Sequence, residues 1–183
     1  MRSYLSVLKL RDYRLLWSGA VLSLLGDGAS WTALSWIALL QGGAAALGVM
    51  SICYTFPVVI GGLFAGPLLD RFSRRTVLIA DSLFRATVVL TVPAAGLLGE
   101  VHLWHVYVVA GMYGLLRIIP LGAVPAVVPD LVPAEKLQPA AALETIAFGV
   151  AGIGGPAIGG ILIPVIGAPR VLIVDACTFL AFA

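Results

Sequence analysis

The amino-acid sequence predicts an all-α polytopic membrane protein. Of its 183 residues, 61% are hydrophobic and only 11% are charged, and the mean hydropathy is +1.07. A soluble domain carries roughly 25% charged residues, because its surface must be hydrated. A disordered chain is likewise polar and highly charged. The composition therefore excludes a soluble globular enzyme and a disordered protein, and leaves an integral membrane protein.

The chain contains six apolar runs that short polar segments separate. A helix needs about 20 apolar residues to cross the hydrocarbon core of a bilayer. Five runs are long enough, whereas the sixth has only 14 residues. We therefore expect five full transmembrane helices and a truncated sixth, in a chain that is incomplete. The expected helices cover residues 15–40, 44–69, 76–98, 103–128, 139–166 and 170–183.

Each run ends at a segment whose residues favour a turn or a solvated loop. Prolines inside the runs are expected to kink the helices without ending them, because neighbouring groups in a membrane protein can satisfy the freed backbone. The connecting segments are residues 41–43, 70–75, 99–102, 129–136 and 167–170.

The basic residues predict the orientation of the chain. Eight of them lie in the N-terminal flank and in the second and fourth connections, whereas the other connections carry only Arg170. Since Lys and Arg concentrate in cytoplasmic loops, we expect a cytoplasmic N-terminus in the inner (plasma) membrane of the cell. The sequence has no basic stripe that would indicate nucleic-acid binding. The eight residues are Arg2, Lys9, Arg11, Arg14, Arg71, Arg74, Arg75 and Lys136.

The second connection reads G-P-L-L-D-R-F-S-R-R over residues 66–75. This resembles the G-x-x-x-D-R-x-G-R-R signature between the second and third helices of major facilitator superfamily transporters, with Ser73 at the last glycine. The resemblance implies that Asp70 caps a helix of the opposite six-helix half and that Arg74 pairs with Asp130. The alternative is a solvated cytoplasmic loop. The motif positions are Gly66, Asp70, Arg71, Arg74 and Arg75.

The fifth run contains a second motif, G-P-A-I-G-G over residues 155–160. It resembles the G-P-x-x-G-G core of the fifth-helix motif that is associated with antiporters of the same superfamily. Small residues also let helices approach closely in any membrane protein, so generic packing is the alternative. The motif positions are Gly155, Pro156, Gly159 and Gly160.

The segments 10–17, 22–27, 33–34 and 129–133 look like the macrolide and siderophore exporter branch of the superfamily. The resemblance covers the whole chain, but only the N-terminal half of a twelve-helix member. It implies proton-coupled export of a small amphipathic molecule, with the bilayer, the substrate, protons and a missing C-terminal half or second copy as partners. The alternatives are uptake, or a non-transporting membrane module such as a split or degraded gene product or an assembly partner.

Asp27 and Arg117 are the candidates for the functional site. Charged residues within a membrane are costly and usually functional. Asp27 lies near the middle of the first run, too deep to reach the interface easily, so we expect it to couple protons or bind a cation. Arg117 lies near the centre of the fourth run and is either part of that site or a structural partner that keeps Asp27 ionised.

Other intramembrane charges are expected to be structural. Asp81 and Arg85 are four residues apart, on one face of the third helix. With Glu144 of the fifth run, they are expected to form ion pairs or to extend toward the interface. Asp175 lies close to the outer end of the sixth run, and the sequence assigns it no role.

The sequence does not predict an enzyme. Residues 28–31 read G-A-S-W, which is close to the G-x-S-G of intramembrane serine proteases, but Trp31 stands at the last glycine. His102 and His105 lie with Glu100 at the outer end of the fourth run, where a hydrated interfacial group is the simpler interpretation than a metal site. We therefore expect no catalytic residues, no metal and no cofactor.

Overall fold

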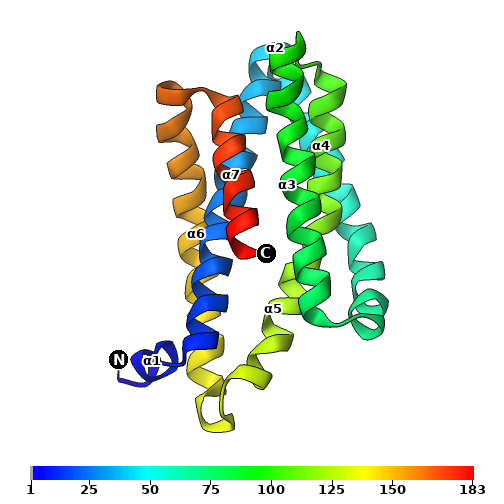
Figure 1. Ribbon diagram of the computed structural model, residues 1–183. Coiled ribbons are helices and arrows are strands. Elements are labelled where there is room, and N and C mark those ends of the chain that lie inside the picture. Colours follow the sequence, from blue (N-terminus) through cyan, green and yellow to red (C-terminus); the bar gives the residue numbers. More distant parts are fainter. Residues whose placement is uncertain (1) are drawn as a thin grey trace.

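The computed structural model describes residues 2–183, and the regular elements within that range are helices. The long helices run roughly along one axis and form a bundle (Figure 1). The side chains of residues 2, 3, 64, 65 and 67–70 lie outside the description. The elements are α1 (Arg2–Leu8), α2 (Arg11–Arg71), α3 (Arg74–Leu98), α4 (Leu103–Leu116), α5 (Ile118–Leu131), the 3-10 helix η1 (Ala134–Lys136), α6 (Leu137–Ile166) and α7 (Ala168–Phe182).

The element α2 consists of two helical limbs that meet at Gly42 and Gly43. Gly42 has φ −139° and ψ 15°, and Gly43 has φ 65° and ψ −159°, so neither residue is helical. Glycine adopts a positive φ without the steric penalty that a Cβ would bring. The chain reverses direction here, so the first limb (11–41) and the second limb (44–71) run antiparallel (Figure 1). The break lies within residues 41–43, where the sequence predicts a turn.

The fourth predicted helix forms two consecutive helices, α4 and α5. Arg117 stands between them with φ −55° and ψ −31°, and its N–H donates to the carbonyls of Tyr113 (3.1 Å) and Gly114 (3.3 Å). Pro120 explains the interruption, because it has no N–H to donate to the Leu116 carbonyl and its ring crowds that oxygen. The α5 axis leans away from the direction of α4 (Figure 1).

Four helices in the described part of the chain are long and apolar enough to cross a membrane: Arg11–Leu63, Arg74–Leu98, Leu103–Leu131 and Ala134–Ile166. The first combines most of both α2 limbs, whereas α7 has only 15 residues. Large apolar side chains cover the outside of the bundle, such as Leu97 at 88% and Ile153 at 79% exposed, and this surface fits lipid rather than water. The chain is thus a multi-pass membrane protein, and the count of five full helices and a short sixth stays a prediction.

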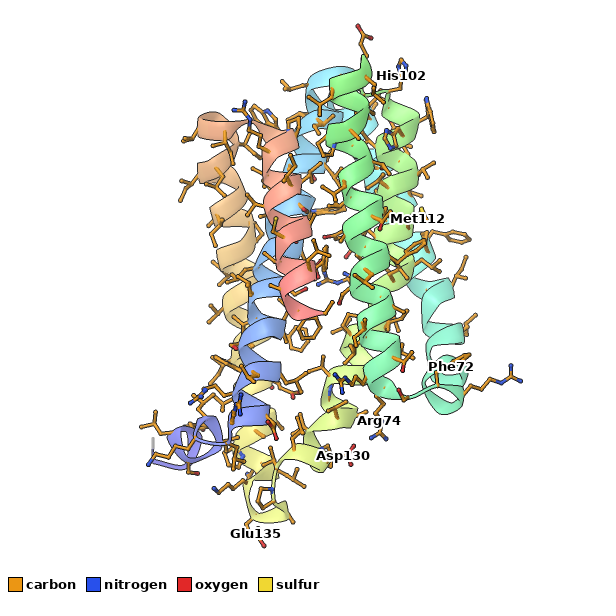
Figure 2. All side chains as sticks on the ribbon, in the orientation of Figure 1. Phe72, Arg74, His102, Met112, Asp130 and Glu135 are labelled. Atoms are coloured by element: carbon orange, nitrogen blue, oxygen red, sulfur yellow. The ribbon has the colours of Figure 1, made fainter. Side chains whose placement is uncertain are left out.

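One end of the bundle carries the basic connections, and we call it the basic end. It contains α1, the α2–α3 connection and η1, and Arg74, Asp130 and Glu135 mark it, whereas His102 lies at the opposite end (Figure 2). The sequence did not predict α1, which lies across this end (Figure 1). Its Ser6 carbonyl accepts a hydrogen bond from Lys136 Nζ at 3.3 Å.

The buried apolar side chains form two clusters at different heights of the bundle. The larger cluster joins α2, α3, α4 and α7 toward the opposite end and includes Leu34, Met50, Val89, Val109, Leu172 and Phe179. The smaller cluster lies at the basic end and includes Val7, Tyr13, Val128, Val132, Ala140 and Leu143. On the first limb of α2, the buried polar residues Ser23 and Asp27 lie between the residues that belong to these clusters.

Candidate functional site

A cavity of about 360 Å³ lies where α4 and α6 face the two limbs of α2. It adjoins a smaller cavity of about 40 Å³ on the side of the basic end. Leu24, Asp27, Arg117 and Phe148 line both cavities. Small-molecule sites combine a mostly apolar and aromatic lining with a few placed polar groups. The larger cavity has that composition, since its aromatic lining residues are Trp31, Tyr54, Tyr113 and Phe148. The smaller cavity adds Tyr13, Trp17 and Phe182.

Asp27 connects the cavity to a buried arginine on α3. Arg85 Nη1 lies 3.1 and 3.4 Å from the two carboxylate oxygens of Asp27, and Arg85 Nε lies 3.1 Å from Asp81 Oδ2. Arg85 is 1% exposed, so none of its charge is screened by solvent. One guanidinium is therefore shared by two buried carboxylates, of which Asp27 alone lines the cavity. Arg85 stays inside the bundle and does not extend to the interface.

Arg117 lies near Asp27 but is not its ion-pair partner. Both residues line the cavity, whereas the base within ion-pair distance of Asp27 is Arg85. The sequence predicts that Asp27 and Arg117 lie near each other, because both lie deep in their apolar runs. The ion-pair partner of Asp27, however, is Arg85 on α3. The depth of a residue along its helix can be counted from the sequence. Which of the two arginines pairs with Asp27 depends instead on which helices lie next to each other.

Glu144 does not join the group of Asp81 and Arg85. It lines the smaller cavity from α6, and its Oε1 is buried without a hydrogen-bond partner among the described residues. Among the described residues, the ion pairs of this group join Arg85 to Asp27 and to Asp81, and none of them includes Glu144. Glu144 instead adds a second carboxylate to the cavity.

Asp175 forms a second buried polar group beside Arg85. Its Oδ2 accepts hydrogen bonds from Ser30 Oγ on α2 and from the Tyr113 hydroxyl on α4. Thr178 Oγ1, one turn along α7, lies 3.1 Å from Asp175 Oδ1. Sequence reasoning missed this group, since Asp175 was placed near the membrane surface. The signal was available in part, because Asp175 and Thr178 share a helix face at i, i+3.

The α2–α3 connection holds an ion pair at the basic end. Arg74 Nη1 lies 3.0 Å from Asp130 Oδ2 and donates to the Ala126 carbonyl at 2.7 Å, and both charged side chains are exposed. Figure 2 shows them facing each other across α3 and α5. This is the pair that the family resemblance implies. The Asp70 side chain lies outside the described residues, and Gly66, Arg71 and Arg75 are exposed.

Ser73 has a defined role in this connection. It has φ −61° and ψ 134°, and its Oγ accepts a hydrogen bond from the Thr76 N–H at 3.2 Å. Ser73 is thus the N-cap of α3, a position that serine favours because its side chain satisfies a free helix N–H. Its negative φ means that the backbone there does not require glycine.

Three positions of the second motif pack α6 against the first limb of α2. A Cβ at Gly155 would lie 2.8 Å from the Leu25 carbonyl oxygen, and one at Gly159 would lie 2.9 Å from that of Ala29. The Pro156 ring lies where a Cβ of Gly28 would be, and Pro156 also lines the cavity. A Cβ at Gly160 would meet nothing within 4 Å.

The fold is that of a multi-pass membrane protein with charged groups at a cavity between its helices. The sequence model of a family described as Transmembrane secretion effector matches residues 2–183. The chain therefore belongs to that family, a branch of the major facilitator superfamily, and the superfamily membership inferred from the motifs is confirmed.

Curated relatives agree with this assignment. An uncharacterized MFS-type transporter, YfiS of Bacillus subtilis, is 29% identical over 160 residues, which are 86% of this chain and 37% of that protein. The multidrug efflux pump Tap of Mycolicibacterium fortuitum is 29% identical over 160 residues, 84% of this chain and 39% of the pump. The staphyloferrin A transporter of Staphylococcus aureus is 24% identical over 168 residues, 90% of this chain and 42% of that transporter.

The chain spans about two fifths of the length of the curated relatives that it matches. No solved structure matches it significantly. Membership in this family supports a role in membrane transport and not in catalysis.

Proposed function

We propose that the chain is the N-terminal half of a proton-coupled exporter of small amphipathic molecules, in the inner membrane with its N-terminus in the cytoplasm. The observation that carries the proposal is the carboxylate of Asp27 at the wall of a largely apolar cavity, held there by Arg85. The aromatic lining would receive the apolar part of a substrate, and Asp27, Arg117 and Glu144 its polar part.

Asp27 can serve as a coupling group because a proton and a cationic substrate can each compete with Arg85 for its carboxylate. A proton on Asp27 would remove the attraction to Arg85, and a cationic group of the substrate would compete with Arg85 for the same carboxylate. Proton and substrate would then be alternative ligands, as antiport requires. In such folds, the two halves rock about a site near the bilayer midplane, and each half contributes one wall.

The two motifs have mechanical roles in this proposal. The Arg74–Asp130 pair joins α3 to α5 at the basic end, where Asp70 and its neighbouring arginines would meet the second half of the transporter. The Gly155 and Gly159 contacts keep α6 fixed on the first limb of α2, next to Asp27. The relatives named as an efflux pump and as a siderophore transporter support a small-molecule substrate.

The test compares two acids that share Arg85. In the complete transporter reconstituted in liposomes, Asp27→Asn should abolish ethidium transport driven by a proton gradient. Asp81→Asn is the matched control, because Asp81 pairs with the same arginine but does not line the cavity. We expect Asp81→Asn to retain at least half of the flux. Equal flux from the wild type and Asp27→Asn at every pH would refute a coupling role for Asp27.

The need for a second half is tested with this chain alone. Because the binding site of such transporters lies between two halves, the 183-residue chain should insert into liposomes but give no saturable, gradient-driven flux of ethidium. Flux should return when a C-terminal half is supplied, whereas saturable flux from the chain alone would mean that a second copy takes the place of that half. If no partner restores flux, the chain is a non-transporting membrane module, and flux only in the direction in which the protons move would favour uptake.

A further inference from the structure

The hydroxyl groups around Asp175 are arranged for a protonated carboxylic acid. Asp175 is 1% exposed, and Ser30 and Tyr113 both donate to its Oδ2. Thr178 Oγ1 lies 2.8 Å from the Asp175 backbone carbonyl and 3.1 Å from Oδ1. A threonine hydroxyl carries one hydrogen and can also accept one. If it donates to the nearer carbonyl, it can accept from a proton on Oδ1, and every polar atom of the group is then paired.

The balance of buried charges also indicates that Asp175 is protonated. Asp27, Asp81 and Asp175 are all buried. Arg85 Cζ lies 5.3 Å from the centre of the ring of Tyr113, which donates to Asp175, and 5.6 Å from that of Phe179. Arg85 pairs with Asp27 and Asp81, whereas Asp175 has hydroxyl partners and no basic partner within ion-pair distance in the described part of the chain. A buried carboxylate without a cation is strongly disfavoured, so the group relieves its excess negative charge by taking up a proton.

On the helices packed around Asp175, the described residues present several other titratable or charged groups. The first limb of α2 presents Asp27, α3 presents Asp81 and Arg85, and α4 presents Tyr113. On α6, Glu144 faces the smaller cavity instead. Gly26 leaves the space that Oδ1 needs, since a Cβ there would collide with this oxygen and with Thr178 Oγ1.

Tyr113 connects Asp175 to the cavity, because the same side chain lines the cavity and donates to Asp175 Oδ2. We propose that Asp175 is a second proton-binding site, distinct from Asp27, which carries a proton on Oδ1 in this conformation and exchanges it with the cavity past Tyr113. Loss of that proton would place three carboxylates around one guanidinium and weaken the hold of Arg85 on Asp27. Proton binding at Asp175 thereby controls how strongly Arg85 neutralises the Asp27 carboxylate at the cavity wall.

The test is infrared spectroscopy of this chain, purified with 13C-labelled aspartate in a detergent without ester groups. The wild type at pH 7 should show the carbonyl stretch of a protonated aspartic acid, shifted by the label. Asp175→Asn should remove the band, whereas the matched variants Asp27→Asn and Asp81→Asn should keep it. Absence of the band at pH 7, or its persistence in Asp175→Asn, would overturn the proposal.

A second variant guards against misfolding of Asp175→Asn. Tyr113→Phe removes one hydrogen bond to Oδ2 and should shift the band to higher frequency, because the carbonyl is then less polarised. A band that does not move in Tyr113→Phe does not belong to Asp175. The measurement uses no transport substrate, so it gives the same answer whether or not the chain proves to be part of an exporter.

Discussion

At the scale of single residues, Arg85 is the centre of the buried charge network. It is the largest of the fully buried side chains and balances two carboxylates from two helices. Its Nη2 and Asp81 Oδ1 are buried without hydrogen-bond partners among the described residues, so the group is not saturated. A buried ionic group that is incompletely paired is poor evidence for stability and better evidence for a function that needs the charge.

Removing Arg85 should be far more damaging than removing Arg74. Arg85→Met leaves Asp27 and Asp81 as buried, unpaired charges, and we expect a loss of about 3–5 kcal/mol in the free energy of unfolding in mixed micelles. Arg74→Ala breaks an exposed pair, which is worth at most about 1 kcal/mol. The triple variant Arg85→Met, Asp27→Asn, Asp81→Asn should regain most of the lost stability. Similar losses for Arg85→Met and Arg74→Ala would contradict the buried network.

At the scale of elements, the contact between α6 and the first limb of α2 is unusually close. The Cα atom of Gly28 is only 2.9 Å from where a Cβ of Gly155 would lie, so two backbones meet with no side chain between them. This contact fixes the helix that carries Asp27 against the helix that carries Glu144 and Pro156. Small residues at such an interface allow the packing that holds membrane helices together.

Two alanine substitutions in α6 separate packing from helix propensity. Gly155→Ala should destabilise the protein by about 1–3 kcal/mol, because its Cβ meets backbone atoms that cannot yield. Gly160→Ala is the control, since its Cβ would meet open space and alanine favours the helix by up to about 1 kcal/mol. Unfolding of both variants in micelles measures the difference. A Gly155→Ala variant as stable as Gly160→Ala would mean that α6 does not pack here.

The N-cap of α3 gives a prediction about the α2–α3 connection. Ser73→Ala removes the oxygen that accepts the Thr76 N–H and should cost about 1 kcal/mol of stability. Ser73→Gly restores the residue usual in the family signature and should cost only a few tenths of a kcal/mol. Thermal unfolding of the two variants side by side is the measurement. If glycine proves as costly as alanine, the Ser73 hydrogen bond to Thr76 is not what sets the stability of this connection.

At the scale of the whole molecule, the two ends of the bundle differ in charge. The basic end carries α1, the arginines of the α2–α3 connection and Lys136, while Arg170 belongs to α7 near the opposite end. The folded chain therefore keeps the asymmetry that the sequence shows. By the positive-inside rule, we propose that the basic end faces the cytoplasm.

Cysteine labelling tests this orientation. In a variant that lacks Cys53 and Cys177, a cysteine at Ser73 should react with a membrane-impermeant reagent only from the cytoplasmic side. A cysteine at Glu100 should react only from outside, and both positions are exposed. Inside-out and right-side-out vesicles provide the two sides. The reverse pattern would refute the orientation, and labelling of both cysteines from one side would refute the expectation that α3 crosses the membrane.

The sequence by itself determined the class of the protein, the reversal at Gly42 and Gly43, and the family. These properties follow from composition, from the length of apolar runs and from local motifs, and each of them is encoded in neighbouring residues. It also placed Asp27 and Arg117 at matching depth, because depth is a count of residues along a helix.

Only the tertiary structure decided which charged groups meet. Asp27 pairs with Arg85 and not with Arg117, Glu144 faces the cavity, and Asp175 lies among Ser30, Tyr113 and Thr178. Each of these contacts joins residues that are far apart in the chain, and each depends on the rotation of one helix against another. Rotation is set by backbone contacts such as Gly28 with Gly155, whose geometry exists only after the helices have packed.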